Sequence, residues 1–418
     1  MKRRDFLLGT GAAGLAALSL RGQRASATEP ARRPPRRLVL VYVTGGWDTT
    51  YALDPKEAPV SVPAGAVQRF AGLDVFTDAS RPSVASYFER HADITTIVRG
   101  IATDGIFHHE CQRRMATGKR DDGEPDLGAM VAHDVGNDLP IPYLILGDVA
   151  YTGPYTASCA RVGTTNQIVE LLGDPTRAPT TDPAAAAEDA LLRRYADASI
   201  ERARATRGAI GYNRRRVDDF ADALARGDRL RQLRDRFGKR GDSQLLANQI
   251  PLALDALQQD LSHAVMLTTR EQWDTHSDNF TQGERHESLF ANLTALVDEL
   301  RRRPGRAAGT RMIDDTVVLV FSEFSRTPNL GGEPGHEGKD HWPITSAAII
   351  GAGVRGGQVF GATTATMGGV LVDLATGQPS PTGLQPLYSN FVAGILALCG
   401  ADPAAHLGTT PAFDAFIA

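Results

Sequence analysis

Two continuous runs of apolar, largely β-branched residues set the strongest limit on how this chain folds. Residues 37–43 read RLVLVYV and residues 317–321 read VVLVF. Runs without alternating polar residues are typical of strands buried on both faces, as in a parallel sheet covered by helices. Related segments at 94–101 and 264–269 lead us to expect an α/β protein with a mostly parallel sheet flanked by helices.

Polar side chains follow the predicted strands, either directly or on the next loop. Open α/β sheets bind ligands at the carboxyl ends of their strands, so we expect a shared site there. The residues placed in this way are Asp48, Thr103, His108, Asp274, His276, Glu323, Arg326 and His341.

The carboxylates and imidazoles of this set predict either a metal site or an acid/base pair. Asp274 and His276 are two residues apart, so in an extended segment their side chains point to the same side. Glu323 follows the apolar run at 317–321, and a Gly- and Pro-rich loop then carries Asp340 and His341.

Three further residues are candidates for catalysis. Thr103 lies at the end of a predicted strand, where a nucleophile is commonly placed, and His108 follows on the next loop. Arg326 is placed to neutralise an oxyanion. The alternatives are a solvated loop or a helix start for the first two residues and, for Arg326, a structural ion pair with Glu323 or Asp340.

The turn after the first strand reads GGWD at residues 45–48. Paired glycines permit a tight turn that brings Asp48 toward the crevice. The turn lacks the GxGxxG pattern, which argues against a dinucleotide site.

The first 27 residues have the features of a twin-arginine signal peptide. Arg3 and Arg4 precede an apolar run at 9–20, and Ala25-Ser26-Ala27 forms a small-residue cleavage site. The alternative is a membrane anchor, but the run is shorter than the roughly 20 residues that a span needs. We therefore expect recognition by the twin-arginine export machinery, cleavage after Ala27, and a periplasmic or secreted protein.

Charge and cysteine content exclude some classes of function. The signal segment carries five basic residues and one acidic residue, so its removal changes the formal net charge from −4 to −8. This balance argues against a nucleic-acid partner. We expect no transmembrane segment in the mature chain. The three scattered cysteines match no metal-binding motif, although a disulfide bond between two of them is possible. The sequence does not indicate the oligomeric state.

The mature chain is expected to be a short linker, 28–36, followed by one α/β domain, 37–418. A helical insertion is predicted at about 183–263, where the sequence is rich in Ala, Arg, Asp and Leu at helical spacing. Its arginines alternate with acidic residues, which is typical of a solvated, ion-paired surface.

The order of motifs resembles a bacterial family called domain of unknown function 1501. These motifs are GGWD, a His-rich loop, WDTH, SEFSRT, DHW and GAGVRGGQVFGAT, and they extend over nearly all of the mature chain. The resemblance implies a distant branch of the alkaline phosphatase and sulfatase superfamily. That superfamily has a mostly parallel α/β sheet with a two-metal site at its carboxyl edge.

The resemblance also implies roles for individual residues. Asp48 matches the metal aspartate of the first strand, and Asp274 and His276 match an Asp/His pair that the superfamily spaces by three residues. Glu323 falls where the superfamily has the Asp of an Asp-His dipeptide. In the same comparison Phe324 replaces the dipeptide histidine, His341 falls near the last histidine, and Phe107-His108 stands where the family commonly has Ser-His.

These matches lead to an expected function. The chain is expected to be an exported metal-dependent hydrolase of small anionic phosphate or sulfate esters, using Zn²⁺, Mn²⁺ or Ca²⁺. The expected ligands are Asp48, Asp274, His276, Glu323 and His341. Two alternatives remain: a non-catalytic envelope protein that binds a ligand or partner, and a redox or cofactor protein suggested only by the export route.

Overall fold

The computed structural model describes residues 33–161, 183–206, 208–232 and 245–418. The chain divides into a unit Met1–Pro34 and a unit Pro35–Ala418. The predicted signal peptide and residues 28–32 of the predicted linker lie outside the described residues. Every helix and strand named below belongs to the second unit.

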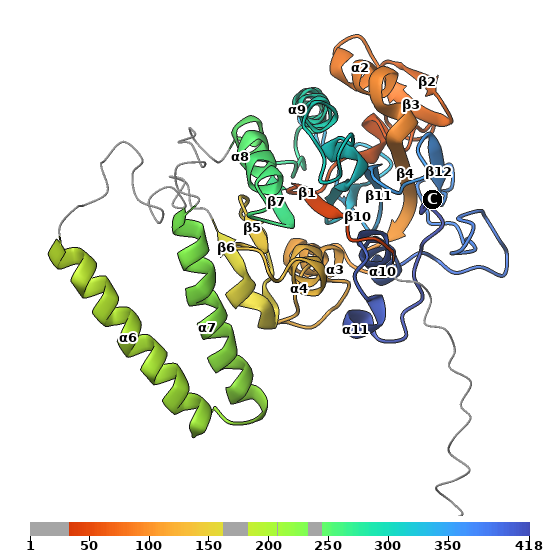
Figure 1. Ribbon diagram of the computed structural model, residues 1–418. Coiled ribbons are helices and arrows are strands. Elements are labelled where there is room, and N and C mark those ends of the chain that lie inside the picture. The colour runs from red at the N-terminus through yellow and green to blue at the C-terminus, as the bar shows by residue number, and fades with distance from the viewer. Residues whose placement is uncertain (1–32, 162–182, 207, 233–244) are drawn as a thin grey trace, which may run out of the picture. The chain divides into compact units, whose positions relative to one another are not determined.

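An eight-stranded sheet forms the centre of this unit (Figure 1). In spatial order its strands are β12 (Gln358–Phe360), β4 (Thr95–Ala102), β11 (Ile344–Gly351), β8 (Thr316–Ser322), β1 (Arg37–Val43), β7 (Ala264–Thr268), β5 (Tyr143–Ile145) and β6 (Cys159–Arg161). Only β11 runs antiparallel to its neighbours, and all other pairs are parallel. The predicted mostly parallel sheet is therefore confirmed.

Helices cover both faces of the sheet, as the side chains of β1 show. Leu38, Leu40 and Tyr42 join one buried apolar cluster, whereas Val39, Val41 and Val43 join another. The first cluster includes side chains from α3 (His108–Thr117), α4 (Leu127–Val135) and α10 (Tyr388–Cys399). The second includes side chains from α2 (Pro82–His91), α8 (Leu246–Gln258) and α9 (Gln282–Arg302). Alternate residues of a strand point to opposite faces, so a continuous apolar run is required here.

The described residues of the predicted insertion range, 183–263, form three helices. Two of them, α6 (Pro183–Ala205) and α7 (Gly211–Gln232), are joined by ion pairs such as Arg204 to Asp218. The third, α8, places Leu254 and Leu257 in the sheet's apolar core. Elsewhere, α11 (Pro403–Leu407) follows α10 near the carboxyl end of the chain.

Two parts of the fold differ from the sequence-based expectation. The edge strand β6 was not predicted from the sequence. A two-stranded hairpin of β2 (Ala66–Phe70) and β3 (Leu73–Thr77) was not expected. Short edge strands leave weak patterns because few of their side chains are buried, and β2 is almost entirely exposed.

Within the described ranges, no helix combines the length and apolarity that a membrane span requires. Cys111, Cys159 and Cys399 are all free thiols in the structure.

Strand register determines where the functional residues meet. Tyr42 of β1 is level with Thr268 of β7 and Phe321 of β8. The three strands are adjacent and parallel, so their carboxyl ends lie at one edge of the sheet. The loops after these strands carry most of the residues singled out by the sequence.

Candidate metal centre

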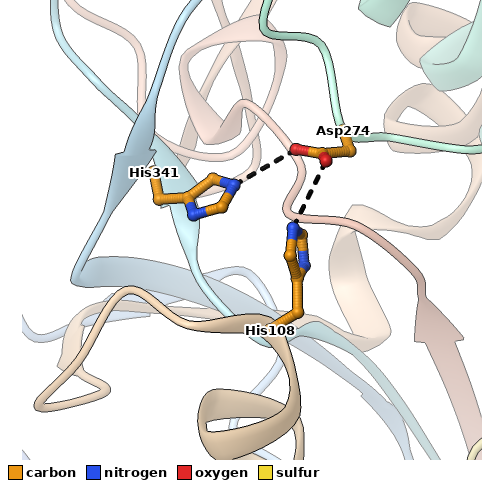
Figure 2. A group of neighbouring side chains, drawn as sticks. All are labelled: His108, Asp274 and His341. Atoms are coloured by element: carbon orange, nitrogen blue, oxygen red, sulfur yellow. Dashed lines mark hydrogen bonds and ion pairs between the residues drawn. The ribbon is translucent and has the colours of Figure 1, made fainter.

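Three side chains from distant parts of the chain converge beside this edge of the sheet. One ligand atom each from His108, Asp274 and His341 lies within 4.8 Å of the other two. Figure 2 shows the two imidazoles directed at the Asp274 carboxylate, with His341 3.2 Å from Oδ1 and His108 3.4 Å from Oδ2.

Local structure fixes each of these three residues. His108 is the first residue of α3, and Asp274 lies on the loop after β7. His341 begins the short strand β10 (His341–Trp342), which pairs with β9 (Ser325–Arg326) directly beyond β8. The two histidines and the aspartate are therefore carried by backbone that is tied to the sheet.

A third histidine joins the group. His276 Nε2 lies 3.0 Å from Asp274 Oδ1 and 2.9 Å from His341 Nε2. The expectation that Asp274 and His276 act on the same side of one segment agrees with these distances.

The partners of the three Nδ1 atoms define how the imidazoles are oriented. Glu323 Oε1 lies 2.9 Å from Nδ1 of His108, and Asp340 Oδ1 lies 2.8 Å from Nδ1 of His276. The Ile106 carbonyl oxygen lies 2.6 Å from Nδ1 of His341. Carboxylates and carbonyls only accept hydrogen bonds, so we assign the proton of each neutral imidazole to Nδ1.

This assignment leaves an unprotonated Nε2 on each of the three histidines. The lone pairs of His276 and His341 then face each other across 2.9 Å, beside the Asp274 carboxylate. Such a contact is favourable only when a cation, either a proton or a metal ion, lies between them. Imidazoles whose Nδ1–H is held by a carboxylate or carbonyl are the usual form of metal-bound histidine. His108, Asp274 and His341 therefore fit a divalent ion held by two nitrogens and one carboxylate, and His276 lies beside Asp274 and His341 as a further nitrogen donor.

Electrostatics keep Asp274 ionised. Burial alone would raise the pKa of Asp274, but the hydrogen bond and charge of Arg326, followed by the contact with His341, lower it to about 2. The pKa values of His108 and His341 shift in opposite directions. The hydrogen bond to Glu323 raises the pKa of His108, whereas burial lowers the pKa of His341.

Glu323, an expected ligand, lies behind His108 and is not part of the converging group. Its buried carboxylate accepts hydrogen bonds from the Tyr42 hydroxyl at 2.5 Å, Gly45 N at 2.8 Å and Ser322 Oγ at 2.9 Å. Together with the contact to His108, these donors use both oxygens. Glu323 therefore contacts His108 from behind, and His108 is the residue that lies in the converging group.

The structure does not bring Asp48 into the group either. Its carboxylate accepts from Lys339 Nζ at 2.7 Å, Asn279 Nδ2 at 2.9 Å and Thr50 Oγ1 at 2.6 Å. Burial alone would raise the pKa of Asp48, but the charge and hydrogen bond of Lys339 lower it. Asp48 is thus neutralised within the protein.

The two other catalytic candidates make structural contacts. Arg326 is fully buried and donates to the carbonyls of Gly45, Gly46 and Trp273 as well as to Asp274. It forms neither of the ion pairs expected from the sequence, with Glu323 or Asp340. Thr103 Oγ1 is buried and donates to the backbone oxygens of Gly105 and Pro343, at 3.0 and 3.1 Å.

Phe324 closes one side of the group. Its ring centroid lies 4.9 Å from that of His108 and 4.3 Å from that of His341. Phe324, which the sequence resemblance places where the superfamily has a histidine, therefore presents an apolar ring against which the imidazoles of His108 and His341 pack.

The sequence left the role of His108 open between a base and a metal ligand, and gave no role to Lys339. The contacts of His108 with Glu323 and of Lys339 with Asp48 were not predicted. The carboxylates of Glu323 and Asp340 were the signal for the contacts with the histidines. A carboxylate near the site requires a hydrogen-bond donor, and each of the two lies beside an imidazole.

Known proteins provide a fold-level comparison. A protein of the alkaline phosphatase superfamily from Vibrio parahaemolyticus is similar at 10% identity and a TM-score of 0.41, over 91% of this chain and 70% of that one. The integral membrane protein lipooligosaccharide phosphoethanolamine transferase A from Neisseria meningitidis is similar at 10% identity and a TM-score of 0.40, over 98% of this chain and 64% of that one. The lipoteichoic acid synthase LtaP from Listeria monocytogenes is similar at 10% identity and a TM-score of 0.40, over 95% of this chain and 80% of that one. Such low values support no inference about this chain's function.

No curated protein matches the sequence. The model of one protein family does match, over residues 35–376, and that family is described as a protein of unknown function, DUF1501. This range includes every residue of the converging group and the strands that carry it. The chain belongs to the DUF1501 family.

Proposed function

We propose that this chain is an exported, metal-dependent hydrolase of phosphate or sulfate esters. The observation that carries the proposal is the convergence of Nε2 of His108, His276 and His341 on the Asp274 carboxylate. Three neutral imidazoles and one carboxylate match the donor set of Zn²⁺ or Mn²⁺ better than that of Ca²⁺, which prefers oxygen.

A bound divalent ion would polarise a phosphoryl or sulfuryl oxygen and lower the pKa of bound water. The protein's own part is to hold the ligands rigidly. Glu323, Asp340 and the Ile106 carbonyl fix the imidazoles, and Arg326 fixes Asp274. A supporting shell of this kind raises the affinity of a metal site and the basicity of its ligands.

The nucleophile in this proposal is water. Within the described ranges, no serine, threonine or cysteine side chain hydrogen-bonds to the four ligands. Phe107 occupies the place where the family commonly has serine, and its side chain is 68% exposed beside His108. We therefore infer direct attack by water, with no covalent ester on the protein.

A second candidate function is non-catalytic binding of an anionic ligand or a partner. It is favoured by the state of Arg326, whose guanidinium is buried and donates to protein acceptors. Measured turnover separates the two candidates, because only the hydrolase converts its ligand.

Export is part of the proposal because the first 27 residues have a twin-arginine pattern. That route carries folded proteins, which suits a chain that takes up its ion before export. We propose a periplasmic or secreted location for the mature protein.

The first prediction concerns metal binding. Purified protein dialysed against Zn²⁺ should retain the ion, and His108→Ala should weaken binding at least roughly 100-fold, since even supporting residues of metal sites contribute 10- to 100-fold. Isothermal titration measures both affinities. His109→Ala is the matched control, because His109 is the next residue, is exposed and lies outside the converging group. Equal losses in the two variants would contradict the assignment of His108.

The second prediction concerns turnover. With Zn²⁺ or Mn²⁺ present, the protein should hydrolyse 4-nitrophenyl phosphate or 4-nitrophenyl sulfate, and a chelator should abolish the activity. His341→Ala should lower kcat/KM at least roughly 100-fold. His336→Ala, on the same loop but exposed and outside the group, should retain it. Metal binding without turnover of either ester would favour the second candidate function.

The third prediction concerns location. Replacing Arg3 and Arg4 together by lysine should leave the protein inside the cell with its first 27 residues attached, because the twin-arginine machinery reads this pair. Cell fractionation and the mass of the recovered chain provide the measurement. Unchanged export of the double variant would contradict this route.

A further inference from the structure

A buried ion pair lies next to the metal centre and takes no part in it. Asp48 follows β1, and Lys339 lies two residues before His341. The Lys339 ammonium is 2.7 Å from Asp48 Oδ2, and both side chains are 0% exposed. Water therefore contributes nothing to the neutralisation of either charge.

The remaining hydrogen-bonding capacity of Asp48 is also used. Oδ1 accepts from the backbone N of Thr50 at 3.1 Å and from its hydroxyl at 2.6 Å. Oδ2 accepts from Asn279 Nδ2 at 2.9 Å as well as from Lys339. Four hydrogen-bond donors, one of which is the positively charged Lys339 ammonium, thus satisfy the carboxylate without a metal ion.

Lys339 is held in place by its backbone. Its N–H donates to the Thr275 oxygen at 3.1 Å, and its oxygen accepts from Arg326 Nη1 at 3.1 Å. Thr275 lies between the ligands Asp274 and His276. The ammonium is therefore delivered to Asp48 from a backbone that is fixed against the metal centre on two sides.

A metal ion at Asp48 would conflict with this cation. An ion bound at roughly 2 Å from Oδ2 would lie within about 5 Å of the ammonium. Repulsion between two such charges is strong where water is excluded. Phe324 adds to the conflict, because it places an apolar ring where the superfamily supplies a second histidine.

We propose that the Lys339 ammonium is a tethered cation that takes the place of a second metal ion at Asp48, so that the protein binds one ion. The superfamily that the sequence resembles has two metal ions at this edge of the sheet, and the residues present here do not fit the second. This inference rests on the proposed ion at His108, Asp274, His276 and His341.

The experiment counts zinc ions in three proteins. Each is equilibrated with excess Zn²⁺, freed of unbound ion and assayed by plasma mass spectrometry together with protein concentration. Wild type should hold one ion per chain. The Asp48→Asn/Lys339→Met double variant removes both charges of the pair while keeping similar side-chain volume, and it should also hold one ion, with a dissociation constant within about threefold of wild type. His341→Ala should hold none.

The possible results are distinct. Two ions in wild type, or loss of zinc from the double variant, would overturn the inference. Absence of zinc from wild type would instead contradict the proposed function.

A second measurement tests the pair without any metal. In excess chelator, Asp48→Asn and Lys339→Met should each lower the melting temperature by more than the double variant does, because each single change leaves one buried charge unpaired. If the decreases in melting temperature of the two single variants add up to the decrease of the double variant, the proposal that Lys339 acts as a tethered cation is contradicted.

Discussion

The guanidinium of Arg326 joins the loops that follow three adjacent parallel strands. It donates to Gly46 O at 2.8 Å after β1, to Trp273 O and Asp274 Oδ1 at 3.0 and 2.7 Å after β7, and to Lys339 O at 3.1 Å on its own loop. This fully buried planar donor therefore satisfies backbone carbonyls from all three loops together. The same contacts hold Asp274 where the histidines reach it.

The two aspartates near this guanidinium, Asp274 and Asp48, have different charged neighbours. Asp274 faces Arg326 on one side and three imidazoles on the other, so it keeps its negative charge and has room for a further cation. Asp48 has one charged partner, Lys339, and is satisfied within the protein by it together with Thr50 and Asn279. Carboxylates of one fold can thus have different roles, because their neighbours decide which of them requires an ion.

Much of the fold was predictable because burial on both faces of a sheet demands continuous apolar runs. The strand Arg37–Val43 was predicted with the bounds observed, and the position of the site follows from strands ending at one edge. Which of the expected carboxylates joins the converging group was not predictable. The partner of Asp48 lies 291 residues away, and no local pattern identifies it. The sequence likewise left His108 open between a ligand and a base, because its contact with Glu323 joins distant parts of the chain.

The most direct test of a single His/Asp metal centre is anomalous diffraction at the zinc edge, from crystals of the protein equilibrated with Zn²⁺. The structure predicts one strong peak per chain, bound by Nε2 of His108, His276 and His341 and by the Asp274 carboxylate, at roughly 2.0 to 2.2 Å. Lys339 should remain on Asp48. A peak bound by Asp48, or a pair of peaks sharing Glu323, would contradict the account.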